Sequence, residues 1–163
     1  MKVVVLGAGG IGGYFGAQLL KVGADITYLL RPVRKKQIDE HGLTVETPSG
    51  SFTVHPKTVT AESVKPDYDL IVLTPKSYDL DDALQSLSGA LSRGVVLPFL
   101  NGLDHLDRLD RVLGRERVMG GVAHIAATLT PEGVVKQLGD LHRLTVGARH
   151  AAQEALEIGR AHV

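Results

Sequence analysis

The sequence predicts one α/β domain, built on an open, mostly parallel sheet with helices on both faces and an inserted hairpin. Short β-branched runs alternate along the chain with segments of helical periodicity, the order expected of parallel strands joined by helical crossovers. The first of these strands runs directly into a glycine-rich turn and then a helix. The length of 163 residues and the hydrophobic content of 44% suit one globular domain with a buried core.

The first thirty residues predict a strand, a helix and a second strand. Lys2–Leu6 is an apolar, β-branched run without alternation, as expected for a central strand that is covered on both faces. The helix ends near Gly23 and is indicated by apolar residues at helical spacing: Phe15, Leu19, Leu20 and Val22. Residues 25–30 form the second strand, which ends at Arg31-Pro32 because the residue before a proline avoids helical geometry.

The middle of the chain predicts a short helix, a hairpin, and two buried strands separated by a helix. Residues 34–41 form the short helix, and residues 43–55 alternate around a Pro-Ser-Gly turn, which is typical of a hairpin. The apolar runs at 70–74 and 95–100 are the strands, and residues 79–91 are a helix with acidic residues in its first turn. A proline in the second run places that strand near an edge or an end.

The last third of the chain predicts one amphipathic helix and two strands. The helix is indicated by a stripe of leucines: Leu103, Leu106, Leu109 and Leu113. Residues 118–130 and 134–146 are predicted strands on either side of a Pro-Glu-Gly turn. We expect residues 1–150 to form the domain, and residues 151–163 to be a truncated helix or a tail that is not native to the protein.

Composition and charge exclude several classes of function. Lys and Arg together number 18, as do Asp and Glu, so no net field favours a nucleic-acid partner or an anionic membrane. A count of zero cysteines excludes disulfides, thiolate metal sites and a cysteine nucleophile, and we expect no metal site. The sequence has neither a secretory signal nor an apolar stretch of the ~20 residues that a membrane span needs. We therefore expect a cytoplasmic protein.

The turn after the first strand satisfies the pattern G-x-G-x-x-G, with the residues Gly7-Ala8-Gly9-Gly10-Ile11-Gly12, which we call the glycine loop. It lies between a strand and a helix, the context that the pattern requires in a dinucleotide site. The three glycines of the pattern permit a tight turn, the approach of a pyrophosphate and close packing of helix on strand. The sequence therefore predicts a Rossmann-like dinucleotide-binding domain, and the alternative is a glycine-rich turn without a ligand.

A basic residue stands where the ribose of the dinucleotide is recognised. About 20 residues past the glycines, an NAD site usually carries Asp or Glu, but here the second strand ends at Arg31. A guanidinium forms a forked, charge-assisted pair with a ribose 2′-phosphate, and further basic residues follow closely: Arg34, Lys35 and Lys36. This pattern predicts NADP rather than NAD, and the alternative is that Arg31 is only a solvated residue at a strand end.

Four segments carry a resemblance to a known family: Gly7-Ala8-Gly9-Gly10-Ile11-Gly12, Leu30-Arg31, Thr74-Pro75-Lys76-Ser77-Tyr78-Asp79 and Leu100-Asn101-Gly102. In order and spacing, the chain resembles the ketopantoate reductase (2-dehydropantoate 2-reductase) family along nearly its whole length. The resemblance implies an NADP-binding domain followed by an all-helical domain. It also implies the reduction of 2-dehydropantoate to pantoate by NADPH, in pantothenate biosynthesis.

The resemblance further implies which residues contact the cofactor and the small 2-keto-acid substrate. The glycine loop, Arg31 and Lys76 would contact NADP. Asn101 would lie beside both the nicotinamide and the substrate, and Ala126 would be a weaker cofactor contact. Lys76 and Asn101 also follow predicted parallel strands at their carboxyl ends, where open α/β sheets bind ligands. Without the resemblance, an exposed loop lysine and an Asn-Gly turn are the alternatives.

The resemblance places the catalytic lysine and most substrate contacts in the helical domain, and we expect these 163 residues not to include that domain. We therefore assign no catalytic residue in the chain, and we expect the chain alone not to turn over 2-dehydropantoate. The alternatives are a related NADP-dependent 2-keto-acid reductase, and a non-catalytic NADP-binding module or truncated relic. The sequence makes no prediction of the oligomeric state.

Overall fold

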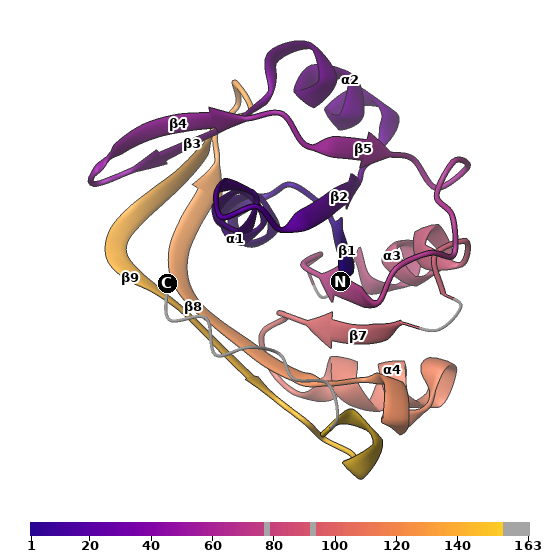
Figure 1. Cartoon of the computed structure of the whole chain (residues 1–163). Helices are drawn as coiled ribbons and strands as arrows, with labels where there is room; N and C mark the ends of the chain where they lie inside the picture. Colours follow the sequence, from indigo (N-terminus) through magenta and orange to yellow (C-terminus); the bar gives the residue numbers. More distant parts are fainter. Residues whose placement is uncertain (77–78, 92–93, 155–163) are drawn as a thin grey trace.

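The computed structural model describes residues 1–76, 79–91 and 94–154, which form two β-sheets with one helix packed between them (Figure 1). The first sheet is parallel and has five strands: β1 (Lys2–Leu6), β2 (Asp25–Leu29), β5 (Lys57–Val59), β6 (Leu70–Leu73) and β7 (Val95–Pro98). Their order across the sheet is β5-β2-β1-β6-β7. The proline-containing strand β7 is at an edge, as predicted.

The chain builds this sheet outward from its centre in two directions. From β1 it steps through β2 to β5 on one side, then crosses back to add β6 and β7 on the other side. The direction reverses between β1 and β6, and open α/β sheets bind ligands outside the carboxyl ends of the strands at such a point. The predicted Rossmann-like fold is confirmed, and β5 is an additional strand that was not predicted.

Helices cover both faces of the parallel sheet, as predicted: α1 (Gly10–Lys21), α2 (Pro32–His41), α3 (Leu80–Leu87) and α4 (Asp104–Leu113). Because successive side chains of a strand point to opposite faces, β1 contributes to two hydrophobic cores. Val3 and Val5 belong to the core that includes residues of α1 and α2. Val4 belongs to the core that includes residues of α3 and α4. The central strand is therefore buried on both sides.

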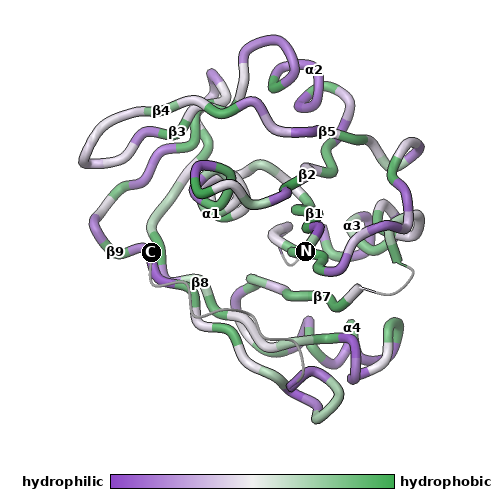
Figure 2. The backbone as a smooth tube through the Cα atoms, viewed as in Figure 1, coloured by the Kyte–Doolittle hydropathy of each residue, from purple (hydrophilic) through white to green (hydrophobic). Residues whose placement is uncertain are grey.

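Helix α2 begins two residues earlier than predicted, at Pro32. A proline suits the first position of a helix because its missing N–H would have no partner inside the helix. Arg31 precedes it with extended backbone angles, φ −65° and ψ 149°. Ile38 is the buried residue of this helix, and Figure 2 shows α2 as a largely hydrophilic segment. The helix therefore lies on the surface with one apolar anchor.

The second sheet has four strands: β3 (Leu43–Thr47), β4 (Gly50–Val54), β8 (Gly120–Leu129) and β9 (Val135–Gly147). Their order is β4-β3-β9-β8. The expectation of a single hairpin is wrong, because β8 and β9 pair with each other as a second, longer hairpin. The connection between them, at 130–134, is too short for a crossover between parallel strands. Strand β9 also pairs with β3, so the two hairpins form one sheet beside α1 (Figure 1).

Two of the predicted helices are shorter in the structure. Helix α3, expected over 79–91, ends at Leu87. The helix expected from residue 151 is a single 3₁₀ turn, Ala151–Gln153, and the tail at 155–163 lies outside the described residues. Within the part of the chain that the structure describes, no helix is long and apolar enough to cross a bilayer.

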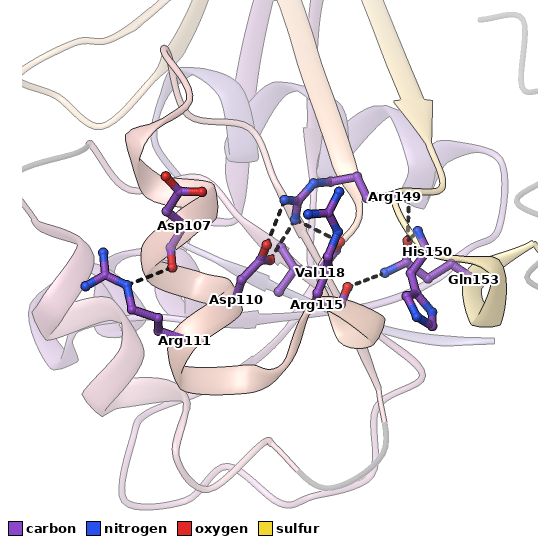
Figure 3. A network of polar contacts seen from close by, with 8 residues as sticks. All are labelled: Asp107, Asp110, Arg111, Arg115, Val118, Arg149, His150 and Gln153. Carbon is purple, nitrogen blue, oxygen red and sulfur yellow. Dashed lines mark hydrogen bonds and ion pairs between the residues drawn. The ribbon is translucent and has the colours of Figure 1, made fainter.

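Polar contacts fasten the end of β9 to α4 and the turn after it. The Arg149 guanidinium pairs with Asp110 through two hydrogen bonds, Nη1 to Oδ1 at 2.7 Å and Nη2 to Oδ2 at 2.8 Å (Figure 3). The two side chains are only 16% and 18% exposed. Gln153 accepts a hydrogen bond from the Arg149 backbone N–H at 2.7 Å and donates one to the Arg115 carbonyl oxygen at 3.0 Å. These bonds hold the last described residues against the domain.

Candidate dinucleotide-binding site

The parallel sheet brings most of the predicted site residues to one edge. The glycine loop follows β1, Arg31 follows β2, and Lys76 and Asn101 come after β6 and β7. Because these strands are parallel neighbours, their carboxyl ends lie on the same edge of the sheet. The edge includes the point between β1 and β6 where the direction of the sheet reverses. Ser77 and Tyr78, which carry part of the family resemblance, lie outside the described residues.

The glycine loop makes a tight turn that two of its glycines require. Gly7 has a φ of +94°, a conformation that favours glycine, and its N–H donates a hydrogen bond to the Leu29 carbonyl oxygen at 3.1 Å. A Cβ on Gly12 would collide with the Gly7 carbonyl oxygen and the Thr74 hydroxyl. That hydroxyl donates a hydrogen bond to the Leu6 carbonyl oxygen at 2.8 Å. Glycine at both positions therefore lets α1 start close against β1 and β6.

The remaining side of the loop is open. A Cβ on Gly9 would meet no atom within 4 Å, although Gly9 has an ordinary φ of −84°. Among the described residues, none accepts a hydrogen bond from the backbone N–H groups of residues 8–12. Unpaired N–H groups at the start of a helix, together with the helix dipole, attract anions. The loop therefore fits the pyrophosphate of a dinucleotide, with room for the ligand at Gly9.

Arg31 extends into solvent beside two carboxylates at the start of the crossover from β6 to β7. Its side chain is 77% exposed, and its Nη2 lies 3.8 Å from Asp79 Oδ1 and 3.9 Å from Asp82 Oδ2. These distances are those of weak, solvated ion pairs. The arrangement leaves the guanidinium accessible to a ribose phosphate, with two negative charges nearby.

The other basic residues of this segment do not gather around Arg31. Lys35 forms an ion pair with Asp39 on its own helix, and Lys36 Nζ lies 3.9 Å from Glu40 Oε1. Arg34 instead points back to the glycine loop, where its Nη2 donates a hydrogen bond to the Ala8 carbonyl oxygen at 3.1 Å. From the sequence, Arg34 is only a basic neighbour of Arg31, because its spacing from the loop carries no signal of this contact.

Lys76 and Asn101 are both exposed at the edge of the sheet. The Lys76 carbonyl oxygen accepts a hydrogen bond from the Asp79 backbone N–H at 2.9 Å, which leads the chain into α3. Asn101 is followed by Gly102 with a φ of +80°, so the Asn-Gly pair is also a turn. A lysine offers a point charge, and an asparagine side chain offers both a donor and an acceptor.

Ala126 lies at an irregularity of the second sheet next to the glycine loop. Ile125 pairs with His142 and Ala127 pairs with Gln137, so the single residue Ala126 faces the longer stretch 138–141 of β9. The approach of β8 to the loop is close, because a Cβ on Gly10 would lie 2.6 Å from the Ala127 carbonyl oxygen. The second hairpin therefore borders the candidate site.

Known proteins similar to this chain were found at the levels of family, sequence and structure. The model of the family described as "Ketopantoate reductase PanE/ApbA" matches residues 3–151. An uncharacterized oxidoreductase of Bacillus subtilis (strain 168), YkpB, is 31% identical over 148 residues, which are 90% of this chain and 48% of that protein. The 2-dehydropantoate 2-reductase of Pyrococcus horikoshii is 35% identical over 139 residues, which are 85% of this chain and 45% of that protein.

A solved structure of D-mandelate dehydrogenase with NADH and anilino(oxo)acetate superposes on the chain with a TM-score of 0.85. The sequence identity is 27%, and the match covers 95% of this chain and 51% of that one. The chain thus spans about half the length of the curated relatives that it matches.

Proposed function

The chain belongs to the ketopantoate reductase family, and from this premise we propose that it holds NADP(H) for the reduction of a 2-keto acid, with 2-dehydropantoate as substrate. The observation that carries the proposal is the open side of the glycine loop. The backbone N–H groups of residues 8–12 have no acceptor among the described residues, and Arg31 follows the neighbouring strand. An anionic pyrophosphate and a ribose 2′-phosphate match these two features.

In the proposed complex, each part of the edge has a separate role. The backbone N–H groups of the glycine loop bind the pyrophosphate, Arg31 binds the 2′-phosphate, and Lys76 is a further contact to the cofactor. NADPH, when bound, supplies the hydride. Asn101 donates and accepts hydrogen bonds, which suits it to orient both the nicotinamide amide and the substrate carbonyl, and Ala126 lies against the cofactor from β8. The alkoxide formed by hydride transfer must be protonated, and we propose no residue of this chain as the proton donor.

A second candidate function is the NADH-dependent reduction of another 2-keto acid. Two observations favour it: the similar D-mandelate dehydrogenase structure contains NADH, and Asp79 and Asp82 place negative charge beside Arg31. Carboxylates near a bound 2′-phosphate would repel it, so the balance between Arg31 and these residues decides between the two cofactors.

Calorimetric titration of the folded chain with NADP⁺ and with NAD⁺ tests the choice of cofactor. We expect tighter binding of NADP⁺. We also expect Arg31→Ala to weaken NADP⁺ binding by about 10- to 100-fold and to leave NAD⁺ binding nearly unchanged, since hydrogen bonds to charged groups are of that strength. Lys36→Ala is the matched control. It also removes one exposed positive charge, but Lys36 lies on α2 and pairs with Glu40 of that helix. Equal losses for both cofactors would reject the role of Arg31, and no binding of either would reject the proposal.

Ketone-dependent oxidation of NADPH, followed by absorbance, tests the substrate. The assay uses this chain joined to the helical domain of a full-length family protein. We expect a higher kcat/KM for 2-dehydropantoate than for a 2-keto acid with an aromatic side chain. A preference for the aromatic acid with NADH would favour the second candidate instead.

A further inference from the structure

We propose that Arg34 is a positioning residue that orients the Ala8–Gly9 peptide of the glycine loop toward the cofactor pyrophosphate. The inference rests on the proposed dinucleotide function and adds a residue to it. Arg34 is distinct from Arg31 in both its place and its task, because it points to the loop and not to the solvent edge.

The guanidinium of Arg34 is held from several sides. Its Nη2 donates a hydrogen bond to the Ala8 carbonyl oxygen at 3.1 Å, and its Nη1 donates one to Gln37 Oε1 at 2.6 Å. Gln37 in turn donates a hydrogen bond to the Glu132 carbonyl oxygen at 2.8 Å, in the turn between β8 and β9. A Cβ on Gly133 in that turn would lie 2.5 Å from Arg34 Nη1. These contacts hold the side chain against the loop.

The hydrogen bond to Ala8 sets the direction of the next N–H group. A trans peptide is planar, so its C=O and N–H point in opposite directions, and the described chain has no cis peptide bond. Fixing the Ala8 carbonyl oxygen on Arg34 therefore turns the Gly9 N–H away from Arg34. Gly9 is the loop residue beside which a Cβ would meet no atom within 4 Å. The arginine thus prepares a donor before the ligand arrives.

The positive charge of Arg34 also favours the binding of an anion near the glycine loop. The side chain is half-buried, and this burial lowers its pKa. No carboxylate among the described residues forms an ion pair with it, and its buried Nε has no hydrogen-bond partner there. A partly buried cation without a counter-ion is costly, and it stands beside a loop of unpaired N–H groups. A pyrophosphate on the far side of the Ala8–Gly9 peptide would offset this charge through space, without contacting the guanidinium.

A merely structural role, in which Arg34 only holds the β8–β9 turn, makes a different prediction. Gln37 shares that task, because it bonds both to Arg34 and to the Glu132 carbonyl oxygen, but it does not touch Ala8. Gln37→Met is therefore the comparison for Arg34→Met: it removes the bond to the turn and one bond that holds the guanidinium, but keeps the bond to Ala8, so we expect it to weaken dinucleotide binding less than Arg34→Met does. Arg34→Lys is a second variant that keeps the positive charge and loses the forked donor geometry.

The test measures the affinities of the whole chain for NADP⁺ and NAD⁺ by calorimetry, and for 2′-AMP by NMR chemical shifts, which detect weak binding. The nucleotide 2′-AMP carries the adenosine and the 2′-phosphate but no pyrophosphate. We expect Arg34→Met to weaken NADP⁺ and NAD⁺ alike, each by about 10-fold or more, and to change 2′-AMP binding by less than about 3-fold. Arg34→Lys should weaken both dinucleotides to a smaller extent, and the Gly9 amide signal should shift in both variants.

Several outcomes would overturn the inference. One is an equal loss of 2′-AMP and NADP⁺ binding in Arg34→Met, and another is unchanged NAD⁺ binding in either arginine variant. A third is that Gln37→Met lowers the dinucleotide affinities as much as Arg34→Met does. If Arg34→Met does not fold, the comparison of Arg34→Lys with Gln37→Met decides. If the unmodified chain binds neither dinucleotide, the proposed function itself fails, which is a separate result.

Discussion

The Tyr28 hydroxyl, on β2, donates a hydrogen bond to the Gly12 carbonyl oxygen in the first turn of α1, at 3.0 Å. The ring is fully buried, and this burial raises the pKa of Tyr28. A Cβ on Gly16, one turn further along the helix, would collide with the same hydroxyl. Tyr28 therefore supports the end of the glycine loop through this hydrogen bond. The tyrosine fits against α1 only because residue 16 is glycine.

The first prediction concerns this pair. We expect Gly16→Ala to lower the free energy of unfolding by about 1–3 kcal/mol through overpacking, and Tyr28→Phe to lower it by about 1 kcal/mol through the lost hydrogen bond. The double variant should cost less than the sum, because the atom nearest to the new methyl group is gone. Urea unfolding of the three variants measures the coupling. Additive costs, within about 0.5 kcal/mol, would show that the two residues do not interact as described.

The second prediction separates two glycines of the loop. Gly9→Ala should change the free energy of unfolding by less than about 1 kcal/mol, because the new methyl group meets no atom. It should weaken dinucleotide binding by about 10-fold or more, because it occupies the space of the pyrophosphate. Gly12→Ala should instead destabilise the fold, by about 1–3 kcal/mol or more, since its methyl group would collide with backbone.

Thermal unfolding and calorimetric titration of the same samples check both expectations. Gly147→Ala, at the end of β9, is the control, because a Cβ there also meets nothing within 4 Å. If Gly9→Ala bound the dinucleotide as tightly as the unmodified chain, the ligand would not approach the loop at this residue.

The sequence predicted those features that local residue identity encodes. The central strands are recognisable because both of their faces are buried, and the glycine loop is recognisable because its backbone needs glycine at defined positions. Strand β5 was missed because its three residues, Lys57–Val59, carry no apolar run. The pairing of β8 with β9 was missed because periodicity identifies a strand but not its partner.

The same limit applies to the candidate site. Parallel strands bring Arg31, Lys76 and Asn101 to one edge, which follows from the fold class alone. Arg34 and Ala8 are 26 positions apart in the sequence, and their contact depends on the direction in which the arginine side chain points. No local sequence pattern predicts that direction. The ion pairs of Arg31 with Asp79 and Asp82 likewise depend on how the crossover that contains α3 is placed.

The third prediction concerns those ion pairs. We expect Asp82→Asn to tighten NADP⁺ binding by about 2- to 5-fold, because an exposed ion pair with Arg31 is worth about 0.2–1 kcal/mol and competes with the 2′-phosphate. NAD⁺ binding should not change, and the gain should shrink as salt screens the charges. Asp81→Asn is the control on the same helix, since Asp81 pairs with Arg108. Equal gains in Asp81→Asn and Asp82→Asn would indicate a general effect of net charge.

The fourth prediction concerns the ion pair that fastens β9 to α4. Removing one partner leaves a largely buried charge, so we expect Arg149→Met to lower the free energy of unfolding by about 3 kcal/mol. The bond to Arg149 lowers the pKa of Asp110 below the usual carboxyl value. The ion pair therefore makes its full contribution to the free energy of unfolding above the pKa of the unfolded carboxyl, about 3.9. That contribution is lost as the pH falls from there through the lower pKa of Asp110 in the folded chain.

Urea unfolding at neutral and acidic pH measures both effects. Arg111→Met is the control, because within the described ranges the Arg111 side chain bonds only to the Asp107 carbonyl oxygen of its own helix, at 3.2 Å. A difference between Arg149→Met and the unmodified chain that persists unchanged at pH 2 would contradict the assignment to Asp110.

The last prediction concerns His105, in the first turn of α4, whose side chain is buried and whose Nδ1 has no hydrogen-bond partner among the described residues. Burial lowers the pKa of His105, and the charge of Arg149 lowers it further, against a smaller opposing effect of Asp104. Between the lowered folded pKa and the unfolded value of about 6.5, the unfolded chain binds more protons than the folded one. The free energy of unfolding should therefore rise with pH across this window and level off above it.

We expect His105→Leu to remove this contribution, so that the difference between the variant and the unmodified chain depends on pH only below about 6.5. Urea unfolding at pH 5, 6, 7 and 8 gives that difference directly, and the other histidines cancel in it because both proteins contain them. In Arg149→Met, the pKa of His105 should return toward its usual value, so its contribution to the pH slope should become smaller. A pH dependence that is the same in His105→Leu and in the unmodified chain would mean that His105 takes up its proton as readily in the folded protein as in the unfolded one.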